Sequence, residues 1–98
     1  MFDRLDQIEL RYNELTSALA SPEIMNDSAK YQKTAKAHSE LSPIVEKYRE
    51  YKDLKKGVED SRAMIAEESD AEMKAYAQEE LAQLEQRIAA LQEELKVL

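Results

Sequence analysis

Apolar side chains recur at helical spacing along most of this chain. In the first 19 residues the intervals alternate between four and three, and the residues are Met1, Leu5, Ile8, Tyr12, Leu15 and Leu19. Such intervals keep the apolar side chains on one face, so the pattern predicts an amphipathic helix up to Leu19. This helix should end at Ser21-Pro22, because a residue before proline is disfavoured in the helical region.

Two prolines divide the region that follows. Pro22 opens a short helical segment, with Ser21 as its N-cap. The next helix is expected over residues 28–41, and Asp27 can cap its first turn. At Ser42-Pro43 two interpretations remain open: a new helix begins at the proline, or one kinked helix continues through it.

Two long helices are predicted for the second half of the chain. The first extends from Pro43 to about Glu68, and its apolar stripe consists of Ile44, Tyr48, Tyr51, Leu54, Val58, Ser61 and Ile65. Ser69 and Glu72 have the spacing of a capping box, which predicts the start of the last helix. That helix has the most regular heptad pattern, at Ala77, Leu81, Leu84, Ile88, Leu91, Leu95 and Leu98.

These elements predict an all-α fold. Because a short turn joins the two long helices, they should form an antiparallel hairpin, and the amino-terminal helix should pack on it. The expected architecture is a coiled-coil-like bundle of three to four helices. Its seam is expected to bury Leu5, Ile8, Tyr12, Leu15, Leu19, Tyr48, Tyr51, Val58, Leu81, Leu84, Ile88 and Leu91.

The composition narrows the classes of function. The 98 residues include one Gly, two Pro, and no Cys or Trp. A single glycine excludes glycine-rich phosphate-binding loops, and the lack of cysteine excludes disulfides, zinc fingers and thiol chemistry. Gly57 lies inside a predicted helix, where glycine lowers helix stability by about 1 kcal/mol relative to alanine. It is either a tolerated surface residue or a point of close packing against a neighbour. No apolar run has the length of a signal peptide or a membrane span, so we expect a cytoplasmic protein without membrane contact.

No catalytic, cofactor-binding or metal site is predicted. His38 is the only histidine, and with no nucleophile nearby it is interpreted as a partly buried packing residue. The glutamate pairs at 67–68, 79–80 and 93–94 diverge by about 100° on a helix, so neither a metal ion nor a proton can be shared. The Glu-x-x-His spacing of di-iron bundles is missing, because residue 35 is alanine.

The charge is unevenly distributed. The formal net charge is -7, yet residues 30–56 contain eight Lys/Arg and four Asp/Glu, a local charge of +4. An acidic chain has no general attraction for DNA, RNA or anionic lipid. The basic residues of this segment form either a solvated face or a contact surface for phosphate groups. Tyr48 and Tyr51 lie among them but belong to the apolar stripe, so their rings are expected in the core.

Four short segments carry a family resemblance. They are Met1-Phe2-Asp3-Arg4-Leu5-Asp6-Gln7-Ile8-Glu9, Ser21-Pro22-Glu23-Ile24, Tyr48-Arg49-Glu50-Tyr51 and Asp70-Ala71-Glu72-Met73-Lys74. In this order and spacing they resemble the amino-terminal helical domain of the bacterial class I peptide chain release factors. The resemblance is closer to the factors that act at the stop codons UAA and UAG than to those that act at UGA and UAA.

The resemblance implies a role in translation termination. Factors of this class hydrolyse peptidyl-tRNA through a Gly-Gly-Gln motif and read the stop codon through a proline-containing loop. Neither motif is in this chain, because Gly57 is the only glycine and neither Pro22 nor Pro43 has the following residues of that loop. We therefore expect residues 1–98 to be a non-enzymatic, amino-terminal piece of a longer release factor. The resemblance implies that this domain docks on the ribosome at the stalk base of the large subunit, the region of protein L11 and its rRNA.

The resemblance also suggests a role for the basic residues. Arg49, Lys52, Lys55 and Lys56 are expected on or near the stalk-base contact. The alternative is a generic acidic coiled-coil assembly or protein-interaction module, which the heptads would suit equally well. The heptad pattern is still running at the end of the chain. Leu91, Leu95 and Leu98 are therefore expected to be exposed or half covered, and to support weak self-association.

Overall fold

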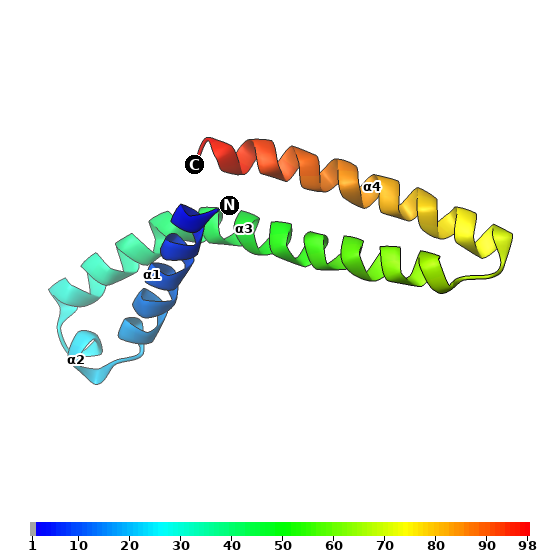
Figure 1. Ribbon diagram of the computed structural model, residues 1–98. Coiled ribbons are helices and arrows are strands. Elements are labelled where there is room, and N and C mark those ends of the chain that lie inside the picture. Colours follow the sequence, from blue (N-terminus) through cyan, green and yellow to red (C-terminus); the bar gives the residue numbers. More distant parts are fainter. Residues whose placement is uncertain (1) are drawn as a thin grey trace. The chain divides into compact units, whose positions relative to one another are not determined.

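The computed structural model describes residues 2–98, in which four α-helices and no strand occur. The helices are α1 (Asp3–Leu19), α2 (Pro22–Met25), α3 (Ser28–Glu67) and α4 (Ala71–Lys96), in the order seen in Figure 1. The predicted all-α class is therefore confirmed. Met1, the first residue of the predicted stripe, lies outside the described residues. None of these helices combines the length and the apolar character that a membrane crossing requires.

The helix α3 continues without a break through Pro43. The prediction of a second helix start at this residue is wrong, and of the alternative, one kinked helix, the continuation through the proline is confirmed. Proline removes one helical hydrogen bond and crowds the preceding turn, which usually ends a helix. Here the residues around it are covered: Leu41 and Ile44 are half-buried, and Val45 is only 1% exposed. Burial of these neighbours outweighs the local preference of the proline.

The chain divides into two compact units, and their boundary lies inside α3, between Glu46 and Lys47. In the first unit α1 packs against the amino-terminal part of α3. The Tyr12 ring stacks on the His38 ring at a centroid distance of 4.2 Å, and Thr16 Oγ1 lies 2.9 Å from His38 Nε2. His38 is thus a half-buried packing residue, as its position in the sequence predicts.

In the second unit α3 and α4 lie side by side and run in opposite directions (Figure 1). Polar contacts join them along their length. The ion pairs are Lys47–Glu94 at 3.4 Å, Glu50–Arg87 at 3.0 Å and Arg62–Glu85 at 3.0 Å, and Gln92 donates a hydrogen bond to the Tyr51 hydroxyl at 3.3 Å. The earlier a residue lies in α3, the later its partner lies in α4, which is the order of an antiparallel pair. The predicted antiparallel hairpin is therefore confirmed.

The predicted N-cap is confirmed for α3 and is wrong for α4. The N–H of Lys30 donates to Asp27 Oδ1 at 3.1 Å, so the expected cap of α3 is confirmed. At α4 the capping box of Ser69 and Glu72 is wrong. Asp70 is the N-cap there, and its Oδ1 accepts hydrogen bonds from the N–H groups of Glu72 and Met73 at 2.9 and 3.2 Å. One carboxylate thus satisfies two free amides at the positive end of the helix.

The core is smaller than the predicted seam. Of the predicted residues, Leu5, Leu15, Tyr48, Tyr51, Val58 and Leu91 are buried. The other six keep partial exposure: Ile8, Tyr12, Leu19, Leu81, Leu84 and Ile88. Val45 is buried although it lies one residue beyond the predicted stripe through Ile44. The stripe assumes one buried face, whereas this part of α3 buries an adjacent face as well.

The carboxy-terminal part of α4 is the best-covered section of that helix. Leu91 is 0% exposed and Leu95 is 3% exposed, while Leu98 keeps partial exposure. The prediction that these leucines are exposed or half covered is wrong for Leu91 and Leu95 and correct for Leu98. The contacts Gln92–Tyr51 and Lys47–Glu94 hold α3 against it. Leu91 and Leu95 are therefore not available for self-association.

Candidate functional site

The four predicted contact residues lie on the section of α3 that belongs to the second unit. Arg49, Lys52, Lys55 and Lys56 are all exposed. At about 100° per residue they fall within about a third of the helix circumference. The structure therefore gathers them into one basic face, which we call the α3 basic face.

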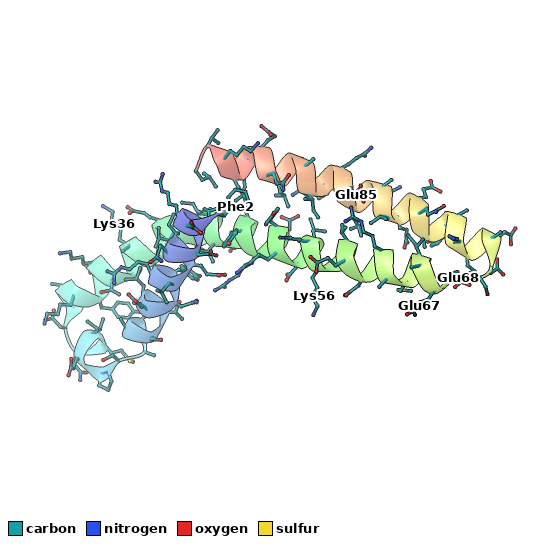
Figure 2. The ribbon with its side chains drawn as sticks, in the orientation of Figure 1. Phe2, Lys36, Lys56, Glu67, Glu68 and Glu85 are labelled. Carbon is teal, nitrogen blue, oxygen red and sulfur yellow. The ribbon has the colours of Figure 1, made fainter. Side chains whose placement is uncertain are left out.

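The α3 basic face is turned away from α4. Figure 2 shows Lys56 pointing away from that helix. Lys52 and Arg49 stand four and seven residues before Lys56, so they share its side of α3. Lys55 lies at the margin of this face, toward the side of Arg62, which pairs with α4.

The basic residues differ in the contacts that their side chains make with the rest of the chain. Lys52 Nζ lies 4.7 Å from the centroid of the buried Tyr48 ring, a cation–π distance. Arg49 and Lys52 also take part in further contacts inside the chain. The side chains of Lys55 and Lys56 have no ion-pair or hydrogen-bond partner among residues 2–98. Contacts within the chain thus orient Arg49 and Lys52, whereas Lys55 and Lys56 extend into solvent.

The tyrosines beside the α3 basic face belong to the core. Tyr48 and Tyr51 are both buried, and their rings lie nearly parallel with centroids 6.4 Å apart. They are therefore not available to stack on nucleic-acid bases, as their place in the apolar stripe predicts. Nearby, the carboxylate of Glu50 is engaged by Arg87. The α3 basic face can offer positive charge to a partner, and it contains no group arranged for acid–base or nucleophilic chemistry.

The carboxylates and the histidine of the described residues form no metal centre. Within residues 2–98 no group of three or more His, Cys, Asp and Glu side chains could hold a metal ion. His38, the one imidazole, is engaged by Tyr12 and Thr16.

Sequence reasoning missed an exposed apolar cluster at the turn of the hairpin. Met64, near the end of α3, and Met73 and Tyr76, in the first turns of α4, are more than half exposed. The sequence could have indicated this cluster, because each of the three is a large apolar residue outside the predicted heptad stripes.

Comparison with known proteins assigns the chain to a family. The PCRF domain family matches residues 8–98, so the chain belongs to the PCRF domain family. This confirms the resemblance carried by the four sequence segments. No solved structure matches the chain.

The curated relatives are release factors. "Peptide chain release factor 1" of Acidobacterium capsulatum is 51% identical over all 98 residues, which cover 27% of that protein. The proteins of the same name from Syntrophomonas wolfei and Agathobacter rectalis are 47% and 42% identical over the whole chain, which covers 28% and 27% of them. The chain thus spans about a quarter of the length of the curated relatives it matches.

Proposed function

We propose that this chain is the ribosome-docking domain of a peptide chain release factor that acts in translation termination at UAA and UAG codons. The observation that carries the proposal is the similarity to proteins named "Peptide chain release factor 1", which extends over all 98 residues at up to 51% identity. The proposed docking partner is the stalk base of the large subunit, with protein L11 and its rRNA. The family resemblance implies this partner, and an exposed basic face on an acidic chain supports it.

The proposal includes the organisation of the whole protein. Residues 1–98 form its amino-terminal helical domain, while the codon-reading loop and the Gly-Gly-Gln motif belong to other domains. The domain therefore positions the factor and does not itself catalyse hydrolysis. The parent gene tests this point: downstream of Leu98 it should encode Gly-Gly-Gln within an Arg-x-Gly-x-Gly-Gly-Gln type of sequence. Further heptads in its place would favour the alternative, an acidic coiled-coil assembly module.

The α3 basic face is the proposed contact with rRNA phosphates. Its four bases are exposed and lie on one side of one helix, so they can approach a nucleic-acid surface together. Each phosphate that a base neutralises releases counterions, which makes binding depend on salt. The surplus of acidic residues elsewhere in the chain opposes nonspecific binding to RNA.

A charge reversal in the full-length factor tests this contact. Lys52→Glu/Lys55→Glu/Lys56→Glu should slow association with ribosomes stalled at a stop codon and should reduce the dependence of the association rate on salt. Hydrolysis at saturating factor should stay nearly unchanged. Lys55→Glu/Lys56→Glu, which leaves the Lys52–Tyr48 contact intact, should show the same effect to a smaller degree.

The matched control is Arg11→Glu/Lys74→Glu/Lys96→Glu. It changes the net charge by the same amount at three exposed positions outside residues 30–56. This variant should associate at nearly the rate of the unmodified factor. Equal association rates for the unmodified factor and the Lys52/Lys55/Lys56 variant at low salt would overturn the assignment of the α3 basic face.

A further inference from the structure

The turn of the hairpin exposes three large apolar side chains around a hollow. Met64, Met73 and Tyr76 are 68%, 59% and 65% exposed. They line a hollow of about 200 Å³ together with Ala77 and the carboxylate residues Glu68 and Glu80. Single exposed apolar residues are ordinary on protein surfaces, but a cluster around a hollow is typical of an interaction site.

A second hollow continues the first along the same edge of the hairpin. It measures about 330 Å³, and its lining residues are Leu54, Glu80, Gln83, Leu84 and Arg87. Glu80 lines both hollows. The residues that α4 contributes recur every three or four positions from Met73 to Arg87, so they follow one edge of that helix for about four turns. We call the two hollows together the tip groove.

Two small residues of α3, Gly57 and Ser61, lie between the groove residues Leu54 and Met64. Leu54, Gly57, Ser61 and Met64 recur at intervals of three and four, which places them on one side of α3. A Cβ atom built at Gly57 would lie 4.0 Å from Leu84 Cδ1, a residue of the groove. An elongated groove between two antiparallel helices is the shape that an amphipathic helix fills.

Most residues of the tip groove come from a strongly acidic part of the chain, and only Leu54 and Arg87 lie outside it. Residues 63–86 contain seven Asp/Glu and one basic residue, Lys74. Glu68 and Glu80 line the groove itself, while the lining base Arg87 is paired with Glu50. An apolar centre with an acidic rim selects a partner with an apolar stripe flanked by Lys or Arg, because charges of opposite sign steer and orient the encounter.

We propose that the tip groove binds a basic amphipathic helix of another protein, with its apolar stripe on Met64, Met73 and Tyr76. Methionine suits this role because its flexible thioether adapts to a partner surface. A second copy of this chain fits less well. Its basic residues at 49–56 flank Tyr48 and Tyr51, which are buried, so that segment offers no apolar stripe to the groove. This contact goes beyond the proposed docking at the α3 basic face and uses different residues, so the two can fail independently.

Methyl NMR of the whole 98-residue chain tests the proposal. The probe is a synthetic helical peptide of about 14 residues, long enough for four turns, with Leu on one face and Lys on the other. We expect the methyl signals of Met64 and Met73 to shift on titration. Met25, which is equally exposed but lies on α2 in the other unit, is the internal control and should not shift. A peptide of the same composition in scrambled order, and one with Glu in place of Lys, should bind much more weakly.

Variants make the test specific to the groove. Met64→Gln/Met73→Gln, which retains side-chain length and helix propensity, should weaken peptide binding about tenfold or more, as expected where anchor residues are lost. Met25→Gln should leave the affinity unchanged. Glu68→Gln/Glu80→Gln should weaken binding and reduce its dependence on salt, whereas Glu23→Gln, an exposed acid on α2, should do neither.

Three outcomes would overturn the proposal. Equal shifts at Met25 and at the groove methionines would show a general attraction between opposite charges. Equal affinity for the scrambled peptide would exclude an amphipathic partner. Shifts at Met64 and Met73 that follow the concentration of the chain alone, with no further change when peptide is added, would show that a second copy occupies the groove.

Discussion

Arg87 of α4 reaches across the hairpin to Glu50 of α3 and donates two hydrogen bonds to the same carboxylate oxygen. Its Nε and Nη2 atoms lie 3.1 and 3.0 Å from Glu50 Oε1. The contact joins residues 37 positions apart in the sequence, so it exists only when the two helices lie in this register. It thus reports the alignment of α3 and α4.

The energetic contribution of this ion pair should nevertheless be small. Both side chains are about half exposed, and exposed ion pairs contribute about 0–1 kcal/mol because water screens the charges. Arg87→Ala should therefore lower the free energy of unfolding by no more than about 1 kcal/mol in urea denaturation, and the difference should shrink at high salt. Arg11→Ala, which removes an i,i+3 pair within α1, is the control. A loss well above that limit would mean that the pair is effectively buried.

Stability should depend mainly on the carboxy-terminal part of α4, where Leu91 and Leu95 are buried. Leu91 is 0% exposed, so Leu91→Ala should lower the free energy of unfolding by about 2–5 kcal/mol. Leu84→Ala should cost less, because Leu84 keeps partial exposure. Leu10, which is 53% exposed, is the matched control, and Leu10→Ala should change stability by about 0.5 kcal/mol or less. Chemical denaturation of the three variants checks this order. A larger loss for Leu84→Ala than for Leu91→Ala would contradict it.

Gly57→Ala should stabilise the chain. The added methyl group would meet only Leu84 Cδ1, at the ordinary contact distance of 4.0 Å. The sequence suggested either a surface position or close packing for Gly57. The structure shows neither, because the residue is half-buried and no neighbour is too close for a side chain. Alanine in a helix is more favourable than glycine by about 0.5–1 kcal/mol. Thermal unfolding should show a raised Tm.

The reverse substitution at a neighbouring site is the control for Gly57→Ala. Ala63→Gly, at an exposed position of the same helix, should lower stability by a similar amount. If Gly57→Ala instead lowers the Tm, the neighbouring helix must approach this point more closely than the distance to Leu84 indicates.

Pro43→Ala should also stabilise the chain. Pro43 is exposed and lies inside α3, so the substitution restores a helical N–H without removing a buried side chain. The gain should be about 1–3 kcal/mol, since the helical benefit is reduced by the greater freedom of the unfolded chain. Hydrogen exchange should show a protected amide at position 43. Pro22→Ala, at the first position of α2, should have little effect, and an equal gain at both prolines would contradict this explanation.

The candidate site was predictable in part. That Arg49, Lys52, Lys55 and Lys56 share one side of a helix follows from their spacing, because adjacent turns of one helix are rigidly related. The position of Lys52 over the Tyr48 ring did not follow from that spacing, since it depends on which side-chain conformations the packed core allows. The tip groove was not predicted, because it exists only between two helices whose outer ends leave Met64 and Met73 uncovered.

The sequence by itself determined the all-α class, the positions of α1, α2 and α4, the cap at Asp27 and the pairing of the two long helices. Each of these depends on residues within a few turns of each other or on the short turn between two long stripes. Only the tertiary structure decided that α3 continues through Pro43, that Val45 is buried, and that Leu91 and Leu95 are covered. A periodic pattern specifies which face of a helix is apolar. It does not specify how much of that face a partner covers, because coverage depends on the register and the spacing of whole helices, to which many distant residues contribute.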